Sequence, residues 1–247
     1  MTLLLAHISD LHLDGTERAT LRATRVMDYV RALPHPVDAL LVTGDIADHG
    51  EEAEYEEAAR ILSADFPVLT CPGNHDARPA YRKALLKEAA DAGPVNRVHH
   101  VAGTTILMCD STIPGRDEGR LDAQTLAWID TILTALPRDR AALIAFHQPP
   151  VALHHPLPDS CMLEEPGPLA DLLDAHPQVA AVLTGHAHTA AASTFAARPL
   201  ITGPATTWTL RMPWEGDAAA DRDQPPGLAF HVLDDDRRLT THYRVVL

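Results

Sequence analysis

The sequence is poor in aromatic residues, cysteine and basic residues. Aromatic side chains make up only 4% of the 247 residues, so we expect a core built mainly from valine, leucine, isoleucine and alanine. The cysteines Cys71, Cys109 and Cys161 form no C-x-x-C pair, which argues against a disulfide framework and favours a reducing compartment. Twenty basic residues stand against 34 acidic ones, a formal net charge of −14, and no Lys/Arg cluster predicts a nucleic-acid track.

Long apolar runs are missing as well. None is long enough to cross a bilayer, and the first residues lack the basic and apolar regions of a secretion signal. We therefore expect no membrane segment and a cytoplasmic protein. The apolar content of 46% is ordinary for a globular protein, and the length suits a single domain over residues 1–247.

Short apolar runs alternate with helical patterns along most of the chain, which predicts an α/β fold. The predicted strands cover 3–8, 39–42, 68–70, 104–109, 142–146 and 179–183, and the predicted helices 17–33, 51–62, about 79–90 and 122–136. Beyond residue 191, short runs separated by Pro, Gly or charges predict antiparallel strands and hairpins. Residues 149–168, rich in Pro and His, predict a cap or lid loop, and residues 213–226 a mobile insertion.

Polar side chains follow five of the predicted strands where each strand ends. They are Asp10 and His12, then Asp45, Asn74, His147, and finally His186 with His188. In open α/β sheets, ligands bind beyond the carboxyl ends of the strands, so these residues should meet along one rim. The i, i+2 spacing of the two pairs places both members on one side of an extended segment.

Carboxylate, amide and imidazole donors without a thiolate suit Mn, Fe, Zn or Co. Each strand-end residue taken alone has a simpler explanation as a turn, a helix cap or a structural histidine. The five-part order is hard to explain by chance. Seven ligands are too many for one ion, but they suffice for two if one carboxylate bridges and water fills the open positions. The sequence therefore predicts a dinuclear metal site.

The residues that carry this order are Ser9-Asp10-Leu11-His12, Gly44-Asp45, Gly73-Asn74-His75-Asp76, His147 and Gly185-His186-Ala187-His188. Between about Leu3 and His188 the chain resembles the calcineurin-like metallophosphoesterase superfamily. This resemblance implies a four-layer αββα sandwich of two mixed β-sheets flanked by helices. It also implies one metal held by Asp10, His12, Asp45 and His188, and a second held by Asp45, Asn74, His147 and His186.

The resemblance also implies roles in catalysis for the loop after the third strand. His75 would stand over the phosphate as the catalytic histidine, Asp76 would orient it, and Asn74 and His75 would contact the substrate. Two cations about 3.5–4 Å apart would clamp the phosphate oxygens and lower the pKa of a bridging water, whose hydroxide attacks phosphorus in line. His75 would donate a hydrogen bond or a proton to the leaving oxygen.

Local residues favour one branch of the superfamily. Phosphoprotein phosphatases have a G-D-x-x-D-R-G pattern, but here His49 replaces the arginine. The stretches 110–115, 119–121 and 126–129 look like those of bacterial class III cyclic-nucleotide phosphodiesterases and related glycerophosphodiesterases. Those proteins have His-His-Pro-Pro where this chain has His147-Gln148-Pro149-Pro150, so Gln148 is a departure. The expected substrate is a 3',5'-cyclic nucleotide or a small glycerophosphodiester.

Two other functions remain open from the sequence. The first is a phosphomonoesterase or nucleotide pyrophosphatase of the same fold. The second is a non-catalytic, metal-free scaffold, which should have lost ligands, whereas all seven are present. Further hypotheses concern a substrate-facing role for His154 or His155, base stacking by Trp208 or Trp214, and a homodimer. Asp110 ends a predicted strand but is interpreted as a turn or cap residue.

Overall fold

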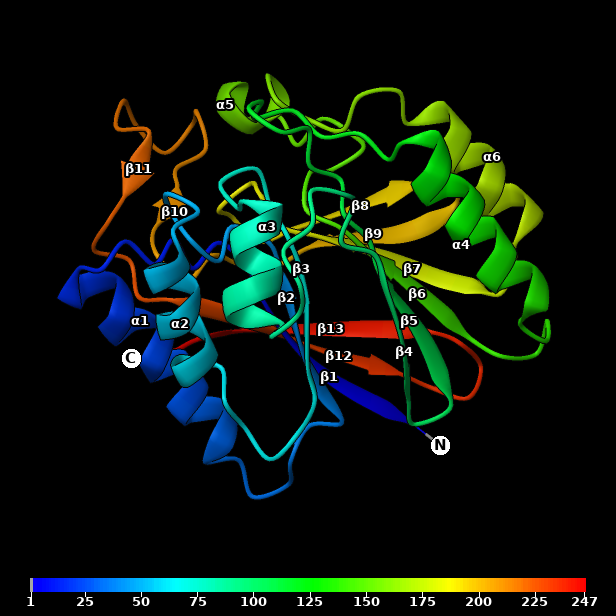
Figure 1. Cartoon of the computed structure of the whole chain (residues 1–247), viewed down its shortest axis with the longest axis horizontal. Helices are drawn as coiled ribbons and strands as arrows, with labels where there is room; N and C mark the ends of the chain where they lie inside the picture. Colours follow the sequence, from blue (N-terminus) through cyan, green and yellow to red (C-terminus); the bar gives the residue numbers. More distant parts are fainter. Residues whose placement is uncertain (1) are drawn as a thin grey trace.

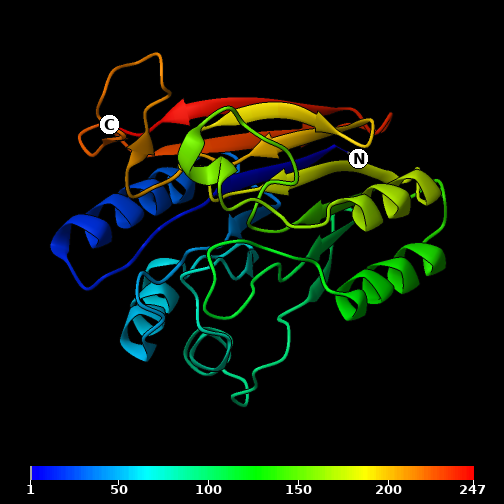
Figure 2. The same cartoon turned by 90° about the horizontal axis from the view of Figure 1, so that it is seen from above.

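Two β-sheets pack face to face in a computed structural model that describes residues 2–247 (Figures 1 and 2). In spatial order, the first sheet consists of β13 (Leu239–Val245), β12 (Gly227–Leu233), β1 (Leu3–Ile8), β2 (Ala39–Thr43) and β3 (Val68–Cys71). The second consists of β4 (Arg97–Val101), β5 (Thr104–Met108), β6 (Ala142–Ala145), β7 (Val179–Thr184), β9 (Arg198–Thr202) and β8 (Ala191–Phe195). Both sheets are mixed: β1, β2 and β3 are parallel in the first, where β12 and β13 pair antiparallel, and β5, β6, β7 and β9 are parallel in the second, where β4 and β8 pair antiparallel.

Helices cover the outer face of each sheet. They are α1 (Glu17–Arg31), α2 (Glu52–Ile61), α3 (Arg78–Ala80), which continues into the π-helical turn η1 (Tyr81–Leu85), α4 (Ala123–Ala135) and α6 (Gly167–Ala175). The short helix α5 (Pro156–Asp159) lies apart from them at one end of the sheets (Figure 1). Figure 1 shows α1 and α2 on one side of the sheets and α4 and α6 on the other. None of the helices in the described part of the chain has the length and apolar character needed to span a bilayer.

Three apolar clusters hold these layers together, because successive residues of a strand point to opposite faces. In β1, Leu3 and Leu5 point between the two sheets, whereas Ala6 and Ile8 face α1 and α2. A third cluster packs α4 and α6 against the second sheet. Helix, sheet, sheet and helix therefore form the four-layer αββα sandwich that was predicted.

The predicted strands and the helices α1, α2 and α4 are confirmed to within about two residues. Asp122 caps α4 as expected, since its carboxylate accepts a hydrogen bond of 2.7 Å from the backbone N–H of Thr125. The helix predicted at about 79–90 was too long: it ends at Leu85, and Lys87 has a left-handed backbone with φ +58°. The edge strand β4 and helix α6 were missed.

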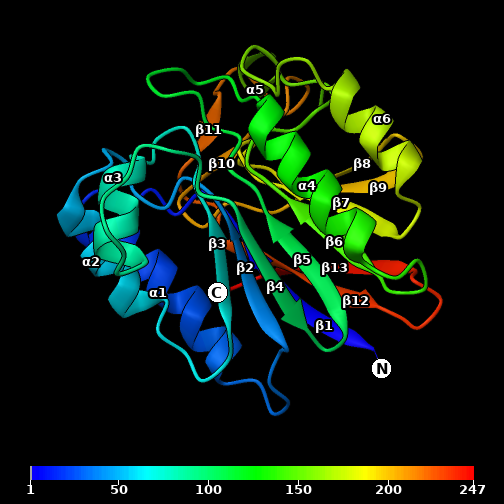
Figure 3. The ribbon, with the colours of Figure 1, turned by 45° about the vertical axis from the view of Figure 1, so that its right-hand side comes forward.

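One end of the sheets carries the segments that were predicted to lie outside the regular elements. The predicted cap at 149–168 contains α5, and the segment 213–226 contributes β11 (Ala220–Asp221), which pairs with β10 (Thr209–Leu210). Figures 1 and 3 place α5 and the β10–β11 ribbon together at this end. They flank the rim where the predicted ligands lie.

Candidate metal centre

The ends of five strands bring all seven predicted ligands into one cluster. The ligands follow β1 (Asp10 and His12), β2 (Asp45), β3 (Asn74), β6 (His147) and β7 (His186 and His188). Asp10, His12, Asp45 and His188 form one group of donor atoms within 4.8 Å of one another, and Asp45, His147 and His186 form another. We call them the first and the second ligand group; they share Asp45, and each consists of residues that the family resemblance assigns to one metal.

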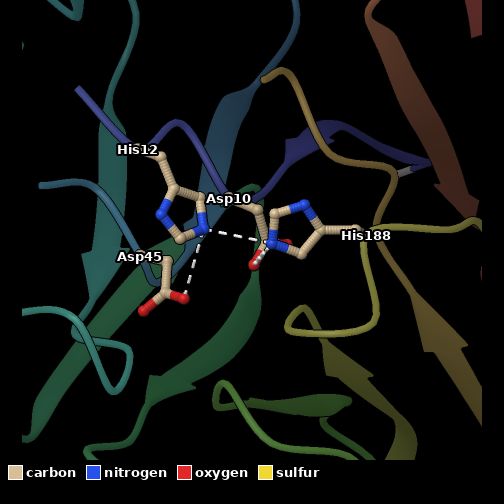
Figure 4. A group of neighbouring side chains, drawn as sticks. All are labelled: Asp10, His12, Asp45 and His188. Carbon is tan, nitrogen blue, oxygen red and sulfur yellow. Dashed lines mark hydrogen bonds and ion pairs between the residues drawn. The ribbon is translucent and has the colours of Figure 1, made fainter. Parts of the chain in front are cut away.

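In the first ligand group, four side chains converge on one point (Figure 4). The Nε2 atom of His12 lies 3.4 Å from Asp45 Oδ2 and 3.1 Å from the Nε2 atom of His188. The latter atom lies 3.5 Å from Asp10 Oδ1. No member is more than 6% exposed, so the group forms the floor of a site rather than a surface patch.

The second ligand group lies on the other side of Asp45. The Nε2 atom of His147 lies 3.3 Å from Asp45 Oδ2 and 3.3 Å from the Nδ1 atom of His186. The side-chain oxygen of Asn74 approaches this Nδ1 atom at 3.1 Å and completes the group as a fourth donor. One carboxylate oxygen of Asp45 therefore faces an imidazole of each group, which is the geometry of a bridging ligand.

The backbone at these positions is strained. Twelve non-glycine residues in the described part of the chain have a positive φ, and five of them are the predicted ligands Asp10, His12, Asp45, His186 and His188, at +43° to +68°. This left-handed region costs side-chain-bearing residues free energy and is held only where the surroundings enforce it. It turns the chain sharply at each strand end, so that successive side chains point into the same cluster.

Three of the imidazoles are fixed by their outer ring nitrogen. The Nδ1 atom of His12 lies 2.8 Å from Asp48 Oδ1, and that of His147 lies 2.6 Å from the Thr43 carbonyl oxygen. The Nδ1 atom of His188 lies 3.1 Å from the Trp208 carbonyl oxygen. Carboxylate and carbonyl oxygens only accept hydrogen bonds, so Nδ1 carries the hydrogen in each case. When such a ring is neutral, its Nε2 atom presents its lone pair to the cluster, as in metal-binding histidines.

Without a cation, this arrangement is unfavourable. The lone pairs of His12 and His188 face each other, and both face carboxylate oxygens. Asp10 Oδ1 is buried and has no hydrogen-bond partner in the described part of the chain. Buried acceptors normally have a donor or a cation. The donor set therefore fits two metal ions, one in each ligand group.

The charges in the cluster shift several pKa values. Burial raises the pKa of Asp10 to about 6, although the charge of His147 opposes this shift. Burial lowers the pKa of His147, but the carboxylates of Asp45 and Asp10 outweigh burial and raise it to about 9. Burial and the charge of His147 lower the pKa of His186 to about 3, so this ring is neutral at physiological pH. Positive charge is thus favoured beside the shared carboxylate.

The loop after β3 places His75 at the mouth of the site. Its ring contacts that of His12 edge-on, with a centroid distance of 4.6 Å, and its Nδ1 donates to the carbonyl oxygen of Asp48 at 2.8 Å. Asp76 does not contact the His75 ring, contrary to the expected orienting role. Its buried carboxylate instead accepts from the backbone N–H groups of Ile46, Ala47 and Gly73, and so fastens the loop to the residues after β2.

Asp48 is a residue that the sequence analysis did not single out. Its carboxylate holds His12, and its carbonyl oxygen holds His75, so one residue orients a ligand of the first group and the exposed histidine. The only signal in the sequence is its position three residues after Asp45, within the segment compared with the phosphatase pattern.

Gln148 has a structural role behind the second ligand group. Its Oε1 accepts a hydrogen bond of 2.6 Å from the Oγ hydroxyl of Ser111. The Ser111 Oγ atom in turn accepts a hydrogen bond from the backbone N–H of His147. Its Nε2 donates to the carbonyl oxygen of Asp117 at 3.2 Å. The side chain is fully buried, so it supports His147 and the 111–119 loop instead of facing the substrate.

A pocket of about 360 Å³ opens above both ligand groups. Its walls include Arg18 at the start of α1, Leu157 and Cys161 of the cap, and Trp208. Trp208 stacks on His188 with a centroid distance of 3.8 Å and an interplanar angle of 25°. The pocket thus combines a polar floor with mixed walls built by segments outside the two sheets.

Other residues considered from the sequence do not face the ligand cluster. Asp110 forms an ion pair with Arg78, with 2.8 Å between Oδ2 and Nε, which agrees with its exclusion from the ligand set. His155 is buried and accepts from the Leu157 N–H at 3.2 Å, and its Nε2 lies 3.0 Å from the Arg211 carbonyl oxygen. It therefore fastens the cap to the neighbouring segment. Trp214 is 73% exposed.

Comparison with known sequences places the chain in one family. Residues 3–190 match the model of the family described as calcineurin-like phosphoesterase. The chain is 32% identical over 244 residues to a probable cyclic nucleotide phosphodiesterase of Rhodococcus erythropolis, covering 94% of this chain and 80% of that protein. It is also 32% identical over 246 residues to a cAMP/cGMP dual specificity phosphodiesterase of Mycobacterium tuberculosis, covering 94% and 76%. A glycerophosphodiester phosphodiesterase of Enterobacter lignolyticus is 28% identical over 93% of this chain and 86% of its own length.

Comparison with solved structures supports the fold. A dimetal phosphatase from Danio rerio superposes with a TM-score of 0.76 at 15% identity, covering 99% of this chain and 96% of that one. A purple acid phosphatase from yellow lupin gives a TM-score of 0.69 at 11% identity, covering 100% of this chain and 52% of that one. The family model matches most of this chain, and the two ligand groups that share Asp45 lie together in its structure. The chain therefore belongs to the calcineurin-like phosphoesterase family.

Proposed function

We propose that this chain is a metal-dependent phosphodiesterase that hydrolyses a 3',5'-cyclic nucleotide or a small glycerophosphodiester. The observation that carries the proposal is the pair of ligand groups that share Asp45 on the floor of a pocket. The names of the relatives support a diester substrate. The ligand donors are compatible with Mn, Fe, Zn or Co.

Two bound cations supply Lewis-acid polarisation of the phosphate and a water of lowered pKa. Asp10, His12, Asp45 and His188 would hold the first ion, and Asp45, Asn74, His147 and His186 would hold the second. His75 is exposed beside the pocket, and its Nδ1 is occupied by the Asp48 carbonyl oxygen. Its Nε2 is therefore the atom that carries a proton to the leaving alcohol oxygen when the ring is an imidazolium.

The test is hydrolysis of bis(p-nitrophenyl) phosphate by protein loaded with Mn²⁺, with p-nitrophenyl phosphate as the monoester control. We expect diester cleavage that disappears in Asn74→Ala and falls by about 10²-fold or more in His75→Ala, in line with the loss of a general acid. Cyclic AMP and a glycerophosphodiester then separate the two substrate classes. A loaded protein that cleaves only the monoester, or a nucleoside pyrophosphate, is a phosphomonoesterase or pyrophosphatase instead.

A further inference from the structure

His186 differs from the other three imidazole ligands in its outer contact. The outer nitrogens of His12, His147 and His188 meet oxygen atoms. His186 turns Nδ1 toward the second ligand group, and its outer atom is Nε2. This Nε2 atom lies 3.2 Å from the Sγ atom of Cys161, and the backbone of Cys161 is a second hydrogen-bond partner of the ring.

The thiol of Cys161 is in the right place to accept this hydrogen bond. Its Sγ lies 3.3 Å from the carbonyl oxygen of Leu157, an oxygen that can only accept, so the S–H group donates there. The sulfur lone pair is then left for the Nε2–H of His186. This chain of hydrogen bonds fixes the ring with the hydrogen on Nε2 and the lone pair on Nδ1, pointing at Asn74 and His147.

The position of Cys161 distinguishes it from the other outer partners of the ligands. Thr43 ends a strand, and Asp48 lies in the loop directly after β2. Cys161 lines the pocket, as Asp48 and Trp208 also do, but it alone of these partners belongs to the cap, just after α5. The thiol thus connects a ligand of the second group directly to a segment that forms the pocket wall.

We propose that Cys161 is a positioning residue: it holds His186 in its metal-binding tautomer and couples the position of the cap to metal binding in the second ligand group. The proposal rests on the proposed metal-dependent function. Outer partners of metal-binding histidines fix the tautomer and ring orientation, and their loss typically weakens metal affinity by about 10- to 100-fold. A thiol is a weak acceptor, so the effect here belongs at the lower end of this range.

Calorimetric titration of metal-free protein with Mn²⁺ tests this role without relying on turnover. In Cys161→Ala we expect the affinity of one of two ions to fall about tenfold, with the other unchanged. Cys161→Ser keeps a hydrogen-bond donor and acceptor, so it should retain most of the Mn²⁺ affinity that Cys161→Ala loses. The matched control is Ser160→Ala, because Ser160 Oγ donates to the same Leu157 carbonyl at 2.7 Å without a contact to His186. Wild-type affinities for both ions in Cys161→Ala and Cys161→Ser would refute the proposal.

The unmodified protein offers a second, reciprocal test. Cys71 and Cys109 are 0% exposed, so Cys161 is the thiol that dithionitrobenzoate reaches in the folded chain. Because coupling is reciprocal, saturating Mn²⁺ should slow this reaction several-fold. An unchanged rate overturns the coupling of cap and metal. If Mn²⁺ binds as expected but no phosphodiester is cleaved, the proposed function fails and the role of Cys161 stands.

Discussion

The two ligand groups share one carboxylate, but their remaining histidines are held by different parts of the molecule. In the first group, the carboxylate of Asp48 fixes His12, and Trp208 fixes His188 through both its carbonyl oxygen and its ring. In the second group, the Thr43 carbonyl holds His147 in the fully buried interior, whereas a thiol on the cap holds His186.

This difference predicts unequal affinities for the two ions. A hydrogen bond to a charged carboxylate is about twice as strong as one between neutral groups, and it raises the basicity of the ligand ring. A thiol accepts weakly and belongs here to a segment outside the sheets. We therefore expect the first group to bind its ion more tightly, and the second to exchange its ion more readily and to respond to the cap.

The largest expected effect comes from the residue that the two groups share. Asp45→Ala should reduce bound metal from about two ions per chain to less than one, because both ions lose a ligand. Diesterase activity should fall by more than about 100-fold. Removing a hydrogen-bond partner of a metal ligand already lowers metal affinity or activity by up to about 100-fold, and here a ligand itself is removed. Metal analysis after gel filtration measures the first effect. Asp117→Asn, which changes another aspartate of the pocket, is the control; two ions retained by Asp45→Ala would contradict the shared site.

Asp48→Ala tests the first group separately. Loss of the carboxylate partner of His12 should weaken the tighter of two Mn²⁺ binding events by about 10- to 100-fold. Asp48→Asn keeps an oxygen acceptor and should have a smaller effect. The carbonyl oxygen that holds His75 is unchanged, so part of the activity should return at saturating Mn²⁺; the rest is lost because the Asp48 carboxylate also lies 3.7 Å from His75 Nδ1. If Asp48→Ala and Cys161→Ala weaken the same binding event in calorimetry, the two groups are not held independently.

The strand ends were the part of this site that the sequence could predict. Each ligand follows a short apolar run, and parallel strands bring their carboxyl ends to one edge whatever the details of packing. The assignment of Asp45 to both metal ions came instead from the family resemblance, because strand-end reasoning required a bridging carboxylate without saying which one. The strand-end reasoning is local in sequence, because it requires only the two to four residues that follow each strand.

The outer partners could not be predicted in the same way. Cys161 lies 25 residues from His186 in sequence, and Ser111 lies 36 residues from His147. These contacts depend on how the cap and the 111–119 loop fold back over the rim. The hydrophobic periodicity of the sequence does not predict the conformation of such loops. Helix α6 was missed for a local reason, since Pro166-Gly167-Pro168 looks like a loop although proline is tolerated in the first turn of a helix.

Gln148→Ala probes the interior support of the second group. It removes the acceptor of Ser111 Oγ and the donor to the Asp117 carbonyl, in a side chain that is fully buried. Leaving such a group unsatisfied costs about 1–3 kcal/mol, so urea denaturation should show a lower free energy of unfolding by this amount. Gln178→Ala removes another buried amide, which donates to Leu133 far from the site, and serves as the control. Only Gln148→Ala should also weaken metal binding in the second group.

The smallest expected effect concerns the aromatic wall of the first group. Trp208→Ala removes the ring that stacks on His188 but keeps the carbonyl oxygen that accepts from its Nδ1. Aromatic stacking contributes about 0.5–1.5 kcal/mol, so the affinity of the first ion should fall by about two- to tenfold, and Trp208→Phe should restore it. In the wild type, tryptophan fluorescence should change as Mn²⁺ fills the first group. Trp214 is exposed and outside the pocket, so Trp214→Ala should keep this signal. A signal that survives in Trp208→Phe and vanishes in Trp214→Ala would mean that the ring on His188 does not report on the metal.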